Sequence, residues 1–323
     1  MDELRGFWAL TLCIASLACA GNAAAECEYA PEPVLTAAPT GEVSGRTGMD
    51  AYGRMVAPVS VNGHGPFRFI VDTGANRSVL SIALAQQLGL TPNGSGDVHS
   101  VHGVTSAPLV AVHSLQYGGV DLSDEELPLL HGQVLGGEQG LLGVDGMRDL
   151  RLRMDFERGC IEITPSRVAR RLRGWAQIRG QLRFGHLVVV RGSINGLHVN
   201  LLLDTGSDST LANPALRDAL SARVRRDRPR VDYTVAYTAG QPVVLDSAIL
   251  VPSMMMGPLE VRNITAYLGD FHIFHLWQLD TEPTLLLGMD VLSQARGVAI
   301  DYGRGIVSLH IRDSLNFGTR IEN

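Results

Sequence analysis

Short apolar runs separated by turn signals dominate this chain, a pattern typical of β-structure. Two of the runs, at residues 67–71 and 199–203, are strand-like, and an Asn-Gly pair precedes each of them, at residues 62–63 and 195–196. Asn-Gly between two such runs is the strongest short signal for a β-hairpin. Each region therefore predicts a hairpin whose second strand leads directly into a turn.

The turn after each strand-like run has the same sequence, Asp-Thr-Gly, at residues 72–74 and again at residues 204–206. Two chance copies of one tripeptide are expected in well under about 1% of chains of this length. A second string, Leu-Leu-Gly-x-Asp, recurs downstream at residues 141–145 and 286–290. Landmarks in the same order at similar spacing indicate an internal duplication of domain-sized units.

The pattern as a whole predicts an all-β protein with two lobes and few short helices. One helical run is expected at residues 82–90, ended by Gly89, and another near residues 214–226. The expected divisions are a signal peptide (1–25), an irregular segment (26–48), lobe one (49–165), a helical or turn connector (166–180), lobe two (181–312) and a tail (313–323).

Composition narrows the class of protein. The chain has 323 residues, of which 45% are hydrophobic and 19% charged, as in a globular protein, and its 36 glycines suit a turn-rich β fold. The net charge of −6 is too mild to indicate a nucleic-acid partner, so we expect none. All 27 basic residues are Arg, which excludes chemistry that needs Lys, including a P-loop or a Schiff base.

The N-terminus predicts export. An apolar stretch at residues 7–20, followed by three Ala at residues 23–25, is typical of a cleaved signal peptide and is too short for a comfortable membrane span. A lipoprotein signal at Cys19 is not favoured, because Ser stands at the first position of that motif. We therefore expect a periplasmic or secreted protein. Cleavage leaves Cys27 and Cys160, and whether they form a disulfide stays open.

The two repeated acids, Asp72 and Asp204, are the candidate catalytic residues. Two carboxyl groups held about 3 Å apart cannot both ionise cheaply, so one keeps a proton while the other stays charged. The charged member can take a proton from water while the protonated member polarises a carbonyl. This is general acid–base hydrolysis of an amide with no covalent intermediate, and we expect neither a metal ion nor another cofactor.

The other two residues of each tripeptide have structural reasons to be there. Gly74 and Gly206 allow a tight turn and a close backbone approach to the carboxylates. Thr73 and Thr205 carry hydroxyls that can hydrogen-bond across a pseudo-twofold axis and lock the turns together, or else pack simply as β-branched residues at a strand end. Their recurrence in both halves favours the locking role.

The residue after the tripeptide differs between the halves: Ala75 follows the first and Ser207 the second. A Ser hydroxyl at that position can donate a hydrogen bond to its carboxylate and lower the pKa. We therefore expect Asp204 to be the more acidic member and Asp72 the more often protonated one.

These residues resemble the aspartic proteases, most closely the bacterial retropepsin-like group. The resemblance is carried by residues 69–76, residues 203–208 and the two Leu-Leu-Gly strings, and it covers residues 50–312. It implies two retropepsin-like acid protease β-barrel lobes related by a pseudo-twofold axis. It also implies an aspartic-type endopeptidase that acts on a polypeptide, and a monomer whose lobes form an intramolecular pseudo-dimer, as in pepsin.

The family closes flaps over its substrate, and two segments are candidates here. The first flap candidate is residues 99–107, with His102 and Gly103 near the tip. The second is residues 233–241, with Tyr237 and Gly240 near the tip. Either segment could instead be an ordinary β-turn.

Two other classes of function remain as alternatives. One is a non-proteolytic peptide-binding or regulatory protein on the same fold, although such a protein has no reason to keep both acids. The other is an actin-like phosphotransferase, in which an Asp-x-Gly turn binds phosphate. A metal site at His272 and His275 is less favoured than packing, because no third ligand accompanies them.

Overall fold

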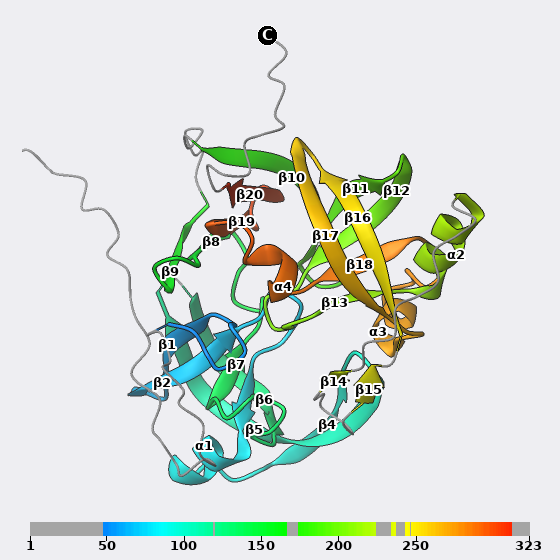
Figure 1. Cartoon of the computed structure of the whole chain (residues 1–323). Helices are drawn as coiled ribbons and strands as arrows, with labels where there is room; N and C mark the ends of the chain where they lie inside the picture. The colour runs from blue at the N-terminus through cyan, green and yellow to red at the C-terminus, as the bar shows by residue number, and fades with distance from the viewer. Residues whose placement is uncertain are drawn as a thin grey trace, which may run out of the picture.

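The structure is a computed structural model, shown in Figure 1. It describes residues 48–118, 120–166, 174–223, 234–236, 243–245 and 247–311. The signal peptide and the tail expected from the sequence lie outside these residues. The expected domain boundaries therefore remain predictions at both ends of the chain.

The first lobe is a closed barrel of six strands. Its strands follow the order β1-β2-β7-β3-β6-β5, and β1 also pairs with β5, which closes the ring. An additional strand, β4, extends the sheet beyond β5. The bounds are β1 Val56–Val61, β2 His64–Val71, β3 Val79–Ser81, β4 Gly94–His99, β5 Val104–Tyr117, β6 Val120–Leu130 and β7 Gly140–Leu142.

The second lobe repeats this barrel. Its strands follow the order β12-β18-β13-β17-β16-β11, and pairing of β11 with β12 closes the ring. The parallel pair β2–β7 corresponds to β12–β18, and the parallel pair β3–β6 corresponds to β13–β17. The bounds are β11 Leu187–Ile194, β12 Leu197–Leu203, β13 Thr210–Ala212, β16 Ala248–Met256, β17 Leu259–Leu268 and β18 Thr284–Leu287. The duplication predicted from the sequence is therefore a duplication of fold.

A third layer joins the two lobes. Strands from the end of each lobe pair in the order β10-β20-β19-β8-β9, and the antiparallel pair β8–β19 links the first lobe to the second. In Figure 1 these strands lie between the two barrels. The bounds are β8 Leu150–Asp155, β9 Cys160–Pro165, β10 Trp175–Arg183, β19 Gly297–Asp301 and β20 Ile306–His310; a separate pair consists of β14 Thr234–Ala236 and β15 Val243–Leu245.

The Asn-Gly pairs make the hairpins that they predict. In the turn between β1 and β2, Asn62 and Gly63 have φ of 50° and 73°, and in the turn between β11 and β12, Asn195 and Gly196 have φ of 49° and 74°. Positive φ at both central residues gives a turn whose twist matches that of the flanking strands. Only Gly and Asn adopt this conformation readily.

The strands that lead to the two Asp-Thr-Gly turns are buried along their whole final halves. Residues 67–71 of β2 and 199–203 of β12 are all buried, and one continuous apolar core runs through both lobes. Uninterrupted burial explains why these runs lack the alternation of a one-sided strand. It also holds the residues that follow each run at the junction of the lobes.

The helices are short. They are α1 Ile82–Gln87, α2 Pro214–Arg223, α3 His272–Leu276 and α4 Met289–Leu292. The first two were predicted; Ser81 caps α1 by accepting a hydrogen bond from the N–H of Leu84 at 3.0 Å. At four to ten residues, no helix in the described ranges could span a membrane.

Two features differ from the sequence-based expectation. The helices α3 and α4 were not predicted, because five and four residues are too few to show a helical period. The expected connector at residues 166–180 ends in strand, since β10 begins at Trp175 and pairs with both β20 and β11. Its arginines at residues 167–173 lie outside the described residues.

A buried ion pair fixes the start of β2 to the loop before β7. Arg68 donates from Nε to Glu138 at 2.8 Å and from Nη2 to the other carboxylate oxygen at 2.9 Å. The two side chains are 5% and 9% exposed. A bidentate pair of this kind satisfies both charges in a dry environment, but either charge is costly to bury without the other.

We predict that Glu138→Ala lowers the free energy of unfolding by about 3–5 kcal/mol, because it removes the carboxylate from a buried guanidinium. Chemical denaturation followed by fluorescence measures this. The matched control is Glu162→Ala, whose partner Arg153 is 34% exposed and whose ion pair should be worth under about 1 kcal/mol. Equal losses in the two variants would contradict the prediction.

Candidate active site

The two Asp-Thr-Gly turns face each other at the junction of the lobes. Asp72 directly follows β2 and Asp204 directly follows β12. A Cβ placed on Gly74 would lie 2.6 Å from Cγ of Asp204, and a Cβ on Gly206 would overlap the carboxyl group of Asp72. Each glycine is therefore packed against the carboxyl group of the opposite turn, where no larger residue fits.

Backbone donors and a shared hydrogen bond hold the two carboxyl groups. The N–H of Gly74 donates to Asp72 at 2.7 Å, and the N–H of Gly206 donates to Asp204 at 2.9 Å. A further hydrogen bond joins the two carboxyl groups to each other. Such a bond requires a proton on one of the two acids.

Burial raises the pKa of both carboxyl groups, and it does so more for Asp204. Loss of hydration is the largest cause for each acid. The pKa of Asp204 rises well above the usual range because the charge of Asp72 and the hydrogen bond to Asp72 add to the effect of burial. Hydrogen bonds and the charge of Arg54 partly offset burial at Asp72. The shared proton therefore resides on Asp204.

The expectation that Ser207 makes Asp204 the more acidic member is wrong. The Ser207 hydroxyl donates to the carbonyl of Ser209 at 2.8 Å, inside its own turn. Only the backbone N–H of Ser207 reaches Asp204, at 3.2 Å. At Ala75 the backbone N–H likewise donates to Asp72. The side-chain difference between these two positions therefore does not distinguish the two acids.

The two threonines lock the turns across the pseudo-twofold axis. The Thr73 hydroxyl donates to the carbonyl of Leu203 at 2.7 Å, and the Thr205 hydroxyl donates to the carbonyl of Val71 at 2.6 Å. Each hydroxyl also accepts a hydrogen bond of 3.1 Å from the backbone N–H of the opposite threonine. All four bonds are buried and all four cross from one lobe to the other.

The Leu-Leu-Gly strings support the turns from behind. The N–H of Asp72 donates to the carbonyl of Leu142 at 3.0 Å, and the N–H of Asp204 donates to that of Leu287 at 2.9 Å. These bonds continue the parallel pairs β2–β7 and β12–β18. The packing that the resemblance implied for these strings is therefore present in both lobes.

The sequence analysis missed two hydroxyl residues that complete this support. Ser78 donates to Asp145 at 2.8 Å and Thr210 donates to Asp290 at 2.7 Å. Each hydroxyl also accepts from the N–H of the glycine in the neighbouring Leu-Leu-Gly string, at 3.1 Å. The signal was in the sequence: a hydroxyl residue stands at the sixth position after each repeated Asp.

The first flap candidate is a β-hairpin whose tip contacts the other lobe. Strands β4 and β5 form the hairpin, and the N–H of Ser100 donates to the carbonyl of Gly103 across the tip at 2.8 Å. The carbonyl of Val101 accepts from the N–H of Ile273, at the start of α3 in lobe two, at 3.4 Å. The hairpin therefore bridges the two lobes through its tip.

Two pairs of rings strengthen this contact. His99 and His272 are stacked with their centroids 5.2 Å apart, and Nδ1 of the first lies 2.9 Å from Nε2 of the second. His102 packs edge-on against Phe271 with the centroids 5.1 Å apart. Burial lowers the pKa of His102, which favours its neutral form in this position.

The second flap candidate is described only in part. The pair β14–β15 supplies the two sides of a hairpin, but Tyr237 and Gly240 lie outside the described residues. In the described ranges, no three His, Cys, Asp or Glu side chains are grouped to hold a metal ion. The contacts of His275 are instead with Asp270 at 2.6 Å and Asp280 at 3.6 Å.

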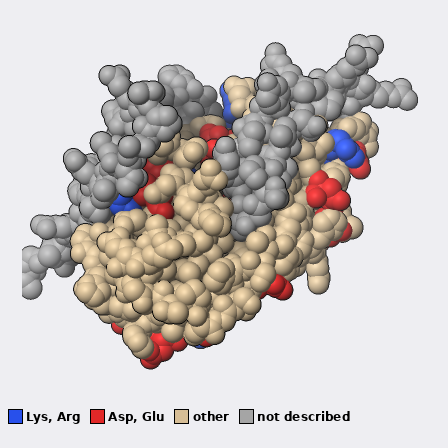
Figure 2. Space-filling model, turned by 90° about the horizontal axis from the view of Figure 1, so that it is seen from below, with Lys and Arg blue, Asp and Glu red and all other residues tan. Residues whose placement is uncertain are grey.

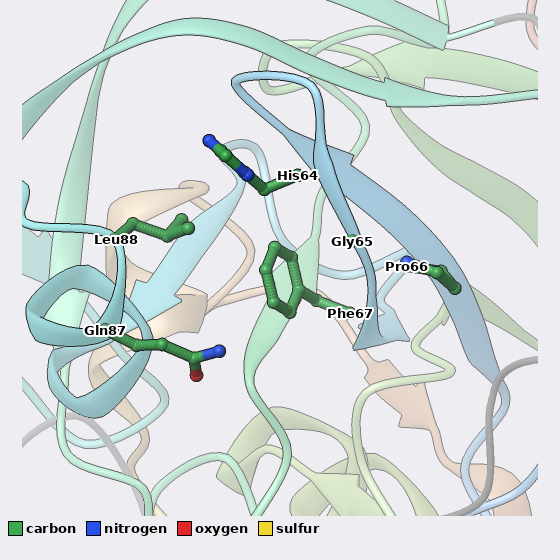
Figure 3. A pocket seen from close by; sticks show the side chains of 6 residues that line it. All are labelled: His64, Gly65, Pro66, Phe67, Gln87 and Leu88. Atoms are coloured by element: carbon green, nitrogen blue, oxygen red, sulfur yellow. The ribbon is translucent and has the colours of Figure 1, made fainter.

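Other surface features do not involve the facing acids. A pocket of about 550 Å³ lies between β2 and α1, and Figure 3 shows the Phe67 ring in its wall, with His64, Leu88 and Gln87 around it. No acid lines it. Figure 2, which views the molecule from below, shows acidic and basic side chains interspersed around a broad uncharged area. Mixed charge of this kind is typical of an ordinary solvated face.

We predict that Thr73→Val lowers the free energy of unfolding by about 1–3 kcal/mol, because it leaves the carbonyl of Leu203 and the N–H of Thr205 without their buried partner. Urea denaturation measures the loss. Thr73→Ser is the matched control, since it keeps the hydroxyl and should lie closer to the parent chain. A valine variant as stable as the serine variant would contradict the locking role.

We also predict that the first flap loosens as the pH falls below about 6.5, the usual pKa of histidine. Burial lowers the pKa of His102 in the docked tip, so docking favours the neutral ring, and this stabilisation is lost as the pH falls. Hydrogen exchange at residues 98–104, corrected for the intrinsic effect of pH, measures the opening.

The control for this prediction is built on the same hairpin. His102→Phe keeps an aromatic ring against Phe271 but removes the imidazole, so most of the pH dependence should disappear. His113→Phe replaces an exposed histidine of β5 that contacts only Asp124 among the described ion pairs, and should change nothing. The other ionisable groups near the tip are His99, Asp97, Asp270, His272 and His275. Opening that persists in His102→Phe would contradict the role of His102.

Comparison with known families agrees with this geometry. The model of one family, described as aspartyl protease, matches residues 57–145 and matches again at residues 190–291. The first match ends at Asp145 and contains Asp72, and the second contains Asp204, so each lobe is one copy of the family domain. A comparison with curated proteins finds no match. The chain therefore belongs to the aspartyl protease family, with both copies of the domain in a single polypeptide.

Proposed function

We propose that this protein is an aspartic endopeptidase that hydrolyses peptide bonds with a water molecule activated by Asp72 and Asp204. The observation that carries the proposal is the facing pair itself: two buried carboxyl groups, one from each lobe, joined by one hydrogen bond. Family membership supports hydrolysis in general. The named residues and the endopeptidase activity are our inference.

The protonation of the pair assigns a role to each acid. Asp72, the ionised member, takes a proton from a water molecule held between the two carboxyl groups. Asp204, the protonated member, donates a hydrogen bond to the carbonyl oxygen of the substrate. Water attacks the carbonyl carbon while Asp204 gives its proton to the carbonyl oxygen, which yields a gem-diol. Asp72 then passes the proton it took from water to the leaving nitrogen as the C–N bond breaks, and a hydroxyl of the gem-diol returns a proton to Asp204 as the carboxyl product forms.

The surroundings of the pair suit this chemistry. Burial keeps one proton on the pair at a pH where an isolated Asp would have none. The threonine bonds fix the separation of the two acids, so the geometry for activating water exists before substrate binds. The hairpin β4–β5 is the proposed lid, and residues 233–241 are the proposed second lid.

The proposed substrate is a polypeptide, and the proposed active form is a monomer whose lobes act as a pseudo-dimer. We further propose that the mature protein works outside the cytosol, in the periplasm or after secretion. Cys160 is disulfide-bonded, which suits an oxidising compartment. The other three cysteines lie outside the described residues, so the pairing with Cys27 remains a prediction.

The non-proteolytic alternative is a peptide-binding protein on the same fold. It predicts that substrate is held between the lobes but not cut. The two all-β barrels and the family match exclude the actin-like alternative. Only the first alternative therefore needs an experiment.

We predict that the purified mature chain cleaves an unbiased peptide library between pH 3 and 8, with a bell-shaped pH dependence that belongs to the coupled pair. Asp72→Asn and Asp204→Asn should each lower kcat by at least about a hundredfold, since each removes one half of the general acid–base system. Mass spectrometry of the products measures both the rate and the preferred cleavage site.

Asp121→Asn is the matched control, because this exposed acid lies on β6, away from the lobe junction. It should retain full activity. Cleavage that survives either active-site substitution would show that the two acids do not form one site. Peptide binding without cleavage by the parent chain, at every pH, would favour the binding protein instead.

A further inference from the structure

Near the facing acids, each lobe contributes one turn that contacts the other lobe. The turn before β1 in lobe one contains Tyr52, Gly53 and Arg54, and the turn before β11 in lobe two contains Phe184 and His186 around another glycine. The turns stand at corresponding positions, since the bridge Met49–Met55 matches the pair Leu182–Val188, but their backbones differ. In the first turn only the glycine has a positive φ, of 78°, whereas all three residues of the second turn have one. Each turn reaches the Asp-Thr-Gly loop of the other lobe.

Only the turn from lobe one brings a fixed positive charge. Nη1 of Arg54 donates to the carbonyl of Gly206 at 3.3 Å, and Nη2 donates to that of Leu135 at 3.3 Å. Asp50 holds the guanidinium through Nε at 2.6 Å and holds the backbone of the same turn through the N–H of Arg54 at 2.8 Å. The Arg54 side chain is 11% exposed.

This position lies next to Asp72. Gly206, whose carbonyl Arg54 binds, is the glycine that packs against the carboxyl group of Asp72. A cation held at Gly206 therefore lies beside the acid of lobe one. The charge of Arg54 accordingly lowers the pKa of Asp72 against the larger effect of burial, whereas none of the main influences on Asp204 is a cation.

Lobe two has no equivalent pair. Leu187 stands where Arg54 would be, and Arg183 stands where Asp50 would be. The guanidinium of Arg183 lies over the ring of Phe184, 4.6 Å from its centroid, and is not among the main influences on either acid. The duplicated site is therefore asymmetric in charge.

We propose that Arg54 is a positioning residue that makes the two carboxyl groups unequal, holding the negative charge on Asp72 and the shared proton on Asp204. The proposal rests on the proposed function for its consequence, which is that Arg54 sets the lower limit of the pH range in which the pair can activate water. The effect of the Arg54 charge on one of two coupled acids does not depend on any activity.

The other charged or titratable groups around the pair act on both acids or on Arg54 itself. Asp50 partly cancels the charge of Arg54, and the ring of Tyr52 lies 5.2 Å from its guanidinium carbon. Tyr302 is buried in the layer that joins the lobes, and the charge of Asp72 and burial both raise its pKa, so it stays neutral. Arg54 is thus the only cation among the main influences on either acid.

The test follows each acid separately by the carbon-13 NMR signal of its carboxyl group in the full mature chain. The background Asp204→Asn leaves Asp72 to titrate alone, and adding Arg54→Gln should raise its apparent pKa by about one pH unit. Arg54→Lys keeps a positive charge and should recover part of that shift. Arg153→Gln removes a half-buried arginine that is not among the main influences on either acid, and should leave the titration unchanged.

A second arm leaves Arg54 in place and does not depend on removing a buried contact. Asp72 titrating alone in the background Asp204→Asn should have a lower apparent pKa than Asp204 titrating alone in the background Asp72→Asn. Unchanged titration of Asp72 in Arg54→Gln would overturn the proposal, whatever the second arm shows. If Arg54→Gln does not fold, an apparent pKa of Asp72 equal to or above that of Asp204 would overturn it.

Activity separates this inference from the proposed function. In otherwise unaltered enzyme, Arg54→Gln should move the acid limb of kcat/KM to higher pH by the same amount as the NMR shift, while a structural defect alone would lower kcat/KM at every pH. An NMR shift in a chain that cleaves nothing would support the role of Arg54 and contradict the endopeptidase. Cleavage with an unmoved acid limb would contradict the role of Arg54.

Discussion

Everything at the junction of the lobes depends on the crossed hydrogen bonds of Thr73 and Thr205. Each hydroxyl donates to a carbonyl at the end of the opposite strand and accepts from the opposite N–H, so two loops from different barrels share one set of buried bonds. Water cannot replace any of these partners, which makes the relative position of the loops as well defined as a helix interior. The facing acids can be buried together only because this contact leaves them no room to separate.

The duplication supplies a symmetric frame on which small differences have large effects. Six strands in each lobe follow the same order, and the same two pairs are parallel. A homodimer would give both acids identical surroundings. A single chain allows Asp50 and Arg54 in one lobe and Arg183 and Leu187 at the corresponding positions of the other, so the surroundings of the two carboxyl groups can differ in charge.

The sequence predicted what depends on local chemistry. The Asn-Gly turns, the buried runs before each Asp, the two lobes and the threonine bonds all follow from residue types that have few other uses at those positions. The sequence-based prediction gave the Ser207 hydroxyl the wrong acceptor. Several acceptors lie within its reach, and only the folded turn selects the carbonyl of Ser209. Strand β10 was missed for a different reason: its partners, β11 and β20, include one that follows more than a hundred residues later, so local pattern carried little information. The contact of Arg54 with the other lobe was invisible for the same reason.

The layer that joins the lobes also determines when folding can be completed. The last strands of lobe one, β8 and β9, do not close their own barrel but pair through β19 with the final strands of the chain. Contacts that span so much sequence form late and slowly. A chain still being made or threaded across a membrane has its first Asp-Thr-Gly turn but lacks both the second turn and the strands that hold the lobes together. The two acids therefore meet only after most of the polypeptide is available for folding, so the fold itself delays assembly of the pair.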